Sequence, residues 1–150
     1  MKTTRQMLSL AAITAIGAMT LGKTAIAADI PVGMGTDASV PFVPHYEFWR
    51  ELVYYQHFAG VSSKRAINIA TEQNAILLGV DQVTGTLQVG KSADFIVLDQ
   101  NPLADLMALE DPRHVVIRGH LIEKPTYKKV KALEEQKANR FFEKHIAQHG

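Results

Sequence analysis

Asp37 is the residue whose type and position most favour chemistry. It follows a short apolar run, residues 30–34, and precedes a loop that contains Pro41 and Pro44. In βα folds the loops after the strands carry the catalytic residues, because these loops build one face of the fold. An aspartate there binds a metal ion or accepts a proton from a bound water. Spacing alone favours the alternative, in which Asp37 caps the next turn through its backbone amides.

The six histidines add little to this candidate site. The sequence contains neither an H-x-H nor an H-E-x-x-H motif, and only His145 and His149 have a helical i, i+4 spacing. These two lie in a charged tail, where exposure is expected rather than a metal site. His45 lies in the same loop as Asp37 and is the candidate for substrate contact, and the alternative is a solvated loop side chain. No Ser/His/Asp arrangement or phosphate-binding glycine loop is indicated.

Two helices follow the candidate loop. Residues 30–34 are expected to form a buried strand, and residues 47–59 a helix that stops at Gly60. Ser62 or Ser63 is expected to cap a second helix, which ends at Gly79. The apolar and small residues of the second helix fall on one face, namely Ile67, Ala70, Thr71, Asn74, Ala75 and Leu78.

Beyond residue 83 the pattern changes from helical to extended. Short apolar runs between turn signals predict strands at Thr86–Val89, Phe95–Leu98, Val115–Ile117 and Leu121–Ile122. The last two flank Arg118-Gly119-His120, which is typical of a tight hairpin. Residues 128–150 are rich in lysine and glutamate and predict a charged helical tail.

The first 27 residues have the three parts of a secretory signal. Lys2 and Arg5 precede an uncharged apolar run over residues 7–22, and Ala25 and Ala27 supply a small-residue cleavage site. The alternative is a retained membrane anchor, but the apolar run is shorter than the ~20 residues that span a bilayer. Export to the periplasm or the medium is therefore expected. Cleavage leaves 123 residues with a formal charge of −2.

The overall composition is that of a soluble globular protein. The chain has 150 residues, 47% of them hydrophobic, and a formal charge of +1. Because no basic excess is available to neutralise phosphates, a nucleic-acid partner is not expected. The absence of cysteine excludes disulfides, cysteine zinc sites and a thiol nucleophile.

Several short motifs occur in unbroken order between residues 30 and 124. They are Val32-Gly33-Met34-Gly35-Thr36-Asp37-Ala38, Val43-Pro44-His45, Ala66-Ile67, Ala70-Thr71, Asn74-Ala75, Leu78-Gly79, Gly85-Thr86-Leu87, Val89-Gly90-Lys91, Ala93-Asp94-Phe95 and Asn101-Pro102-Leu103. This series resembles the C-terminal third of the metal-dependent amidohydrolases, of the imidazolonepropionase-like and prolidase-like kind. The part from Gly85 onward is the most specific.

The resemblance implies an α/β fold and a role for Asp37. Residues 30–34 then correspond to the eighth strand of a (β/α)₈ barrel, so that the chain holds the last βα unit of an incomplete barrel. Asp37 corresponds to the aspartate that binds the metal and takes a proton from the hydrolytic water. Residues 86–123 correspond to strands of the flanking β-sandwich. Ser39 departs from the glycine common in relatives, in the loop that contacts substrate.

The resemblance also implies partners for Asp37 that this sequence does not contain. In the family an H-x-H motif, a carboxylated lysine or glutamate, and further histidines complete the metal site. A single carboxylate cannot hold a catalytic zinc, which needs about three protein ligands, and one strand cannot close a barrel. Zinc or another divalent metal is therefore the cofactor of the family but is not expected to be retained by this chain alone.

Three functions remain open. The first is an exported hydrolase of carbon–nitrogen bonds in small amides, using a metal-activated water, present as a truncated form that is inactive alone. The second is a non-catalytic binding or assembly module that pairs through exposed strand edges. The third is a fragment completed by a second chain with the other barrel strands. The expected regions are 1–27 (signal), 28–127 (amidohydrolase-related, with barrel elements at 30–80 and sandwich strands at 83–124) and 128–150 (tail).

Overall fold

The computed structural model describes residues 24–26, 28, 30–36 and 45–127. Most of the predicted signal, the whole predicted tail, and Asp37 with the rest of its loop lie outside the described residues. Among the described helices, none combines the length and apolar character of a membrane span. Export and the cleavage site after Ala27 therefore stay predictions.

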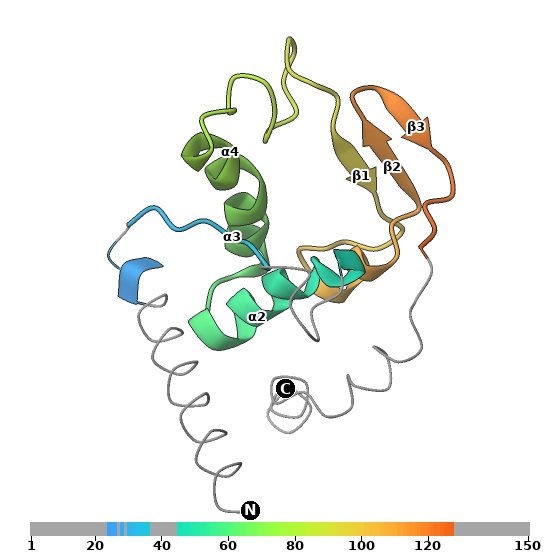
Figure 1. Cartoon of the computed structure of the whole chain (residues 1–150). Coiled ribbons are helices and arrows are strands. Elements are labelled where there is room, and N and C mark those ends of the chain that lie inside the picture. The colour runs from blue at the N-terminus through green and yellow to red at the C-terminus, as the bar shows by residue number, and fades with distance from the viewer. Residues whose placement is uncertain (1–23, 27, 29, 37–44, 128–150) are drawn as a thin grey trace, which may run out of the picture.

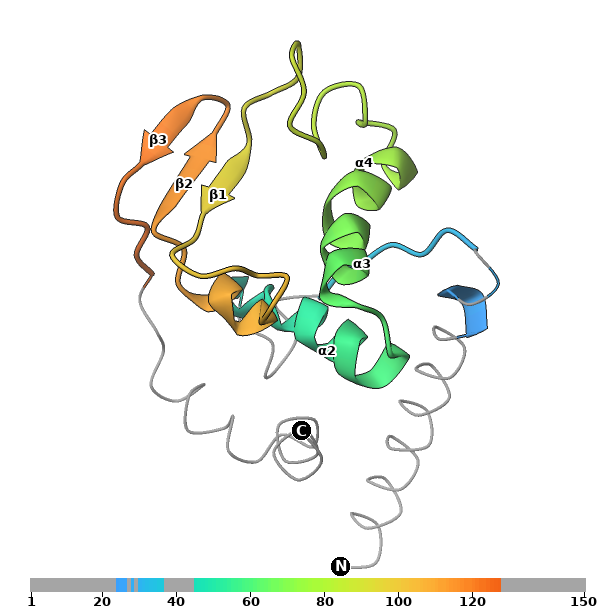
Figure 2. The same ribbon diagram turned by 180° about the vertical axis from the view of Figure 1, so that it is seen from behind.

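The described elements form a helical side and a sheet side (Figures 1 and 2). Helix α2 and the 3₁₀ turn η3 lie between the two sides and contact each other. Residues 79–94 connect α4 to the sheet at the opposite end in both views. In chain order the elements are η1 His45–Glu47, α2 Arg50–Ala59, α3 Ser63–Asn68, the π-helical turn η2 Ile69–Gln73, α4 Asn74–Leu77, β1 Phe95–Val97, η3 Leu106–Glu110, β2 His114–Ile117 and β3 His120–Ile122.

The first helix stops where the sequence predicts. Gly60 has a positive φ of 68° and its N–H bonds to the carbonyl of Gln56 at 3.1 Å, as in a left-handed helix C-cap. The predicted start is wrong by three residues, because residues 45–47 form a separate 3₁₀ turn and the α-helix begins at Arg50.

The second helix is confirmed, with Ser62 as its N-cap and Gly79 just past its end. The Ser62 hydroxyl accepts the N–H of Arg65 at 3.2 Å. The predicted buried face is partly wrong, because Thr71 and Leu78 are exposed. The buried residues are instead Ser63, Ala66, Ile69 and Ala75. The shift begins before η2, since Ala66 and Ile69 are fully buried whereas the predicted Ile67 and Ala70 are only half-buried.

The apolar core joins the helices to η3. Ile69 and Leu106 are the largest fully buried side chains, at 0% and 1% exposure. The buried cluster consists of Met34, Leu52, Val61, Ala66, Ile69 and Leu106. Ile26, from the helical turn at residues 24–26, packs against this cluster.

The three strands form one antiparallel sheet in the order β1-β2-β3. The predicted hairpin is confirmed, because Ile117 pairs with His120 across a two-residue turn. Arg118 and Gly119 in this turn have φ values of 51° and 79°. Two positive φ values identify the type I′ geometry that matches the twist of a hairpin. The strand predicted at Phe95–Leu98 is confirmed for residues 95–97.

Two other predicted strands are wrong. Residues 86–89 form no strand: Thr86 lies in a bend, Val89 lies in a turn, and Leu87 and Val89 are 70% and 107% exposed. Residues 30–34 pair with no strand within the described ranges, and Ile30 is 55% exposed. A short apolar run becomes a strand only where a neighbouring strand accepts its backbone hydrogen bonds.

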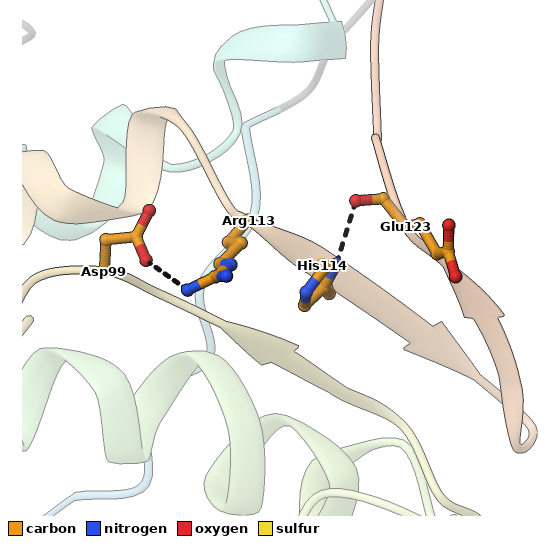
Figure 3. Close-up of polar contacts among 4 residues, drawn as sticks. All are labelled: Asp99, Arg113, His114 and Glu123. Carbon is orange, nitrogen blue, oxygen red and sulfur yellow. Dashed lines mark hydrogen bonds and ion pairs between the residues drawn. The ribbon is translucent and has the colours of Figure 1, made fainter.

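Polar contacts at the sheet are largely exposed (Figure 3). Arg113 forms an ion pair with Asp99 at 3.2 Å, and the Nδ1 atom of His114 lies 2.8 Å from the backbone carbonyl of Glu123. Both partners of the ion pair are more than half exposed. Such pairs contribute at most about 1 kcal/mol, so the sheet depends on its backbone ladder.

Asp94 ties the hairpin to the preceding loop. Its carboxylate accepts the Arg118 N–H at 2.7 Å and the Thr84 hydroxyl at 3.0 Å. The pKa of this carboxyl lies below its ordinary value of 3.8, chiefly because of the Arg118 N–H and next because of the Ser92 side chain.

We expect Asp94→Asn to make stability less dependent on pH. Because the pKa is lowered in the folded state, the ionised carboxylate stabilises the fold above its ordinary pKa. That contribution is lost as the pH falls through the lowered pKa. Thermal unfolding should therefore show the variant melting below the wild type at neutral pH, with the gap closing on acidification. A gap of the same size at every pH would contradict this role.

Candidate functional site

The segment that leads into Asp37 is held by side chains of two helices. Asn74 uses both ends of its amide on Met34: its Oδ1 accepts the Met34 N–H at 2.8 Å, and its Nδ2 donates to the Met34 carbonyl at 2.9 Å. The Tyr55 hydroxyl donates to the carbonyl of Gly33 at 2.8 Å. Backbone groups that a neighbouring strand would otherwise satisfy are thus satisfied by side chains.

Local sequence explains this arrangement. Asn74 directly follows the π-helical turn. A Cβ atom at Gly33 would lie 3.1 Å from both the Asn74 Oδ1 and the Leu77 Cδ1. Glycine therefore allows the segment to approach α4 closely, and any larger residue would push against the amide of Asn74.

Burial raises the pKa of two side chains on α2. Desolvation raises the pKa of Glu51, which lies one turn before Tyr55. The pKa of Tyr55 is raised by desolvation first and by the charge of Glu51 second. Tyr55 therefore keeps its proton at neutral pH and remains the donor to Gly33.

Of the two site residues predicted from sequence, only His45 lies within the described ranges. Asp37 lies outside them. His45 is exposed at the start of η1. Sequence reasoning missed Asn74 and Tyr55 as the residues that hold the segment. The available signal was that Asn74 carries an amide on a helix face of otherwise apolar and small residues.

The donor set does not fit a complete metal site. Within residues 24–26, 28, 30–36 and 45–127, no three His, Asp or Glu side chains are grouped so that they could hold an ion. Asp37 and His45 together would supply two ligands, and a catalytic zinc takes about three from the protein. The described residues therefore do not by themselves supply the ligands of a catalytic metal.

An open depression of about 660 Å³ lies elsewhere. It is lined by Asp99, Gln100, Met107, Ala108, Glu110, Asp111 and residues 125–127. Arg113 already pairs with the Asp99 carboxylate (Figure 3). None of its lining residues belongs to the segment 30–36. One of them, Tyr127, stacks on Tyr46 with ring centroids 5.0 Å apart.

Comparison with known proteins gives consistent matches. The family model of the amidohydrolases matches residues 14–122, which include part of the predicted signal. Ochratoxinase from Aspergillus niger is 31% identical over 105 residues, covering 67% of this chain and 21% of the relative. The chain therefore spans about a fifth of the length of the curated relatives it matches.

Solved structures agree with this match. A protein assigned as a prolidase from Bifidobacterium longum has a TM-score of 0.73 and 44% identity, covering 78% of this chain and 29% of that one. A Xaa-Pro dipeptidase with bound methionine has a TM-score of 0.65 and 32% identity, and the match covers 70% of this chain and 25% of that one. The Aspergillus niger ochratoxinase structure has a TM-score of 0.61 and 28% identity, and the match covers 73% of this chain and 25% of that one.

Proposed function

Because this chain belongs to the amidohydrolase family, and to its prolidase-like kind, we propose that it is part of an exported hydrolase that cleaves carbon–nitrogen bonds in small amides. The family relationship implies a TIM-barrel-type fold, of which the chain covers a fraction. Its small open sheet agrees with that fraction. In this proposal the chain contributes the last βα unit and strands of the flanking sandwich, and is inactive alone. Residues 30–34, which form no strand in this chain, become one only beside the barrel strands of the completed enzyme.

The observation that carries the proposal is the anchored segment before Asp37. Residues 33 and 34 are held by hydrogen bonds from α2 and α4, and the motif Gly35-Thr36-Asp37 follows directly. We propose that Asp37 supplies one metal ligand and accepts the proton of the attacking water. His45 is the proposed substrate contact.

The remaining ligands come, in this proposal, from barrel strands on another polypeptide. Amidohydrolases are generally metal-dependent, and a divalent ion supplies Lewis-acid polarisation of the substrate carbonyl. Zinc or a related divalent ion is the proposed cofactor of the completed enzyme. The chain's own part is to hold its carboxylate at one position of the site.

A specific observation favours a second candidate, a non-catalytic assembly module. All three residues of β1 and all three of β3 are exposed, and Phe95, Ile96, Leu121 and Ile122 are apolar. These strands are the two edges of the sheet. Open, apolar edges favour pairing with another chain or with a second copy.

The decisive experiment is complementation. The Bifidobacterium longum relative is expressed without the segment that matches this chain, mixed with this chain and zinc, and assayed on Xaa-Pro dipeptides. We expect no turnover by either piece alone and turnover by the mixture. Asp37→Asn should lower that turnover by about 10²- to 10⁴-fold, the usual contribution of a positioned proton acceptor. Asp81→Asn, in the turn after α4, is the matched control and should keep full turnover.

Each other outcome of the complementation experiment would overturn a different part of the proposal. A stable complex without turnover would overturn the hydrolase proposal and favour the assembly module. Turnover by this chain alone that Asp37→Asn abolishes would overturn the claim that it is inactive alone. Turnover that survives Asp37→Asn would show that Asp37 is not the proton acceptor of the reaction.

A further inference from the structure

We infer that Asn74 is a positioning residue, which sets the orientation of the backbone that leads into Asp37. The inference rests on the proposed function, since it concerns the carboxylate assigned there. Asn74 lies on α4, forty residues away from Met34 along the chain, and forms two hydrogen bonds to it. In this inference Asn74 acts through the backbone of Met34 and not by contact with the substrate or a metal.

The peptide group between Gly33 and Met34 is held from both sides. In a trans peptide the C=O and the following N–H point to opposite sides of the chain. Tyr55 binds the C=O of Gly33, and Asn74 binds the N–H of Met34. The two side chains therefore fix the rotation of this peptide group about the chain axis.

The next peptide group is held by the same amide. The Nδ2 of Asn74 donates to the Met34 carbonyl at 2.9 Å. A primary amide presents one acceptor and one donor side by side, which matches the N–H and C=O of a single extended residue. With the groups on both sides of its Cα held, Met34 has restricted φ and ψ.

Other features of the fold constrain the same contact. The π-helical turn directly precedes Asn74, and π-type turns frequently occur at functional sites. Gly33 leaves 3.1 Å between a hypothetical Cβ and the Asn74 Oδ1. The Met34 side chain is itself buried in the apolar cluster, at 7% exposure. Helix, glycine and core packing thus all restrict the position of Met34.

The fixed backbone at Met34 sets the direction in which the chain continues toward Asp37. Asp37 comes three positions after Met34 in the sequence. A rotation of the Met34 peptide would be passed on to each later residue and would shift the carboxylate. A shift of a catalytic group by about 1 Å can lower the reaction rate about 100-fold. The amide of Asn74 therefore affects the rate through the position of the carboxylate, without contact with the substrate.

The test uses three variants of the full chain. Asn74→Ala removes both contacts to Met34, and Tyr55→Phe removes only the contact to Gly33. Asn68→Ala is the matched control, because the Asn68 side chain lies just before the π-helical turn and bonds to Arg65 and Glu72 rather than to the segment 30–36. Hydrogen exchange of the Met34 amide is measured on each chain alone, and kcat and KM are measured in the complemented enzyme.

We expect Asn74→Ala to expose the Met34 amide to exchange while α2 amides stay protected. In the complemented enzyme kcat should fall about 10- to 100-fold, as for other residues that orient a ligand, with KM changed by less than about twofold. Tyr55→Phe should lower kcat by less, and Asn68→Ala should leave kcat and Met34 exchange unchanged.

The failures are distinguishable. Full kcat in Asn74→Ala beside an Asp37-dependent wild type would overturn the positioning role and leave the proposed function intact. Unchanged protection of Met34 would overturn the contact itself, whatever the activity. A wild-type mixture without turnover would overturn the proposed function, and the positioning role would fall with it.

Discussion

Replacing Leu106 with alanine is expected to lower the free energy of unfolding by about 2–5 kcal/mol, the range for truncating a buried leucine. Leu106 is 1% exposed and belongs to the same cluster as Leu52 and Ile69. It comes from η3, between β1 and β2 in the sequence, and η3 packs on α2. Its truncation therefore leaves a cavity at the contact that joins the sheet side to the helical side.

Urea unfolding followed by circular dichroism measures this loss. Leu103→Ala is the matched control, because Leu103 is in the same connection but 54% exposed, and its substitution should cost less than about 0.5 kcal/mol. Equal midpoints for the two variants would show that η3 does not anchor the sheet. Loss of near-ultraviolet signal in Leu106→Ala alone would agree with the prediction.

Gly85→Ala is the second substitution with a large expected effect. Gly85 has a φ of 90°, and a Cβ there would lie 2.5 Å from the Ala75 Cβ and 3.2 Å from the Thr71 carbonyl. The positive φ costs about 1–2 kcal/mol for a side chain. The clash with α4 and η2 adds about 1–3 kcal/mol, as in other overpacked sites.

Gly90→Ala separates these two causes. Gly90 has nearly the same φ, 92°, but a Cβ added there would meet nothing within 4 Å. Its substitution should cost only the conformational part. Differential scanning calorimetry of the two variants is the measurement, and Gly85→Ala should melt at the lower temperature. Equal melting temperatures would mean that the loop at residue 85 is not packed against α4.

Elements with local determinants were predictable from sequence. Ser62, Gly60 and Gly79 mark helix ends because capping requires a hydroxyl acceptor or a positive φ within one turn. Arg118-Gly119 marks the hairpin, since a type I′ turn needs two positive φ values. The position of the sheet's strands at residues 95 and 115 follows from their apolar runs between turns.

Elements that depend on distant partners were not predictable in the same way. The runs at residues 30–34 and 86–89 have strand composition, but pair with no strand within the described ranges. The π-helical turn is a single-residue change of hydrogen bonding that leaves no clear composition signal. The buried face at Ala66 and Ile69 depends on packing against the rest of the apolar cluster.

By itself the sequence determined the family resemblance, the candidate Asp37, the helix ends and the hairpin, because each depends on residue types within a few positions of one another. Only the tertiary structure decided how Gly33 and Met34 are held. Tyr55 and Asn74 are 22 and 40 residues away from the atoms they bind. Contacts over such separations arise from helix packing and from the space that Gly33 leaves, neither of which is encoded in local spacing.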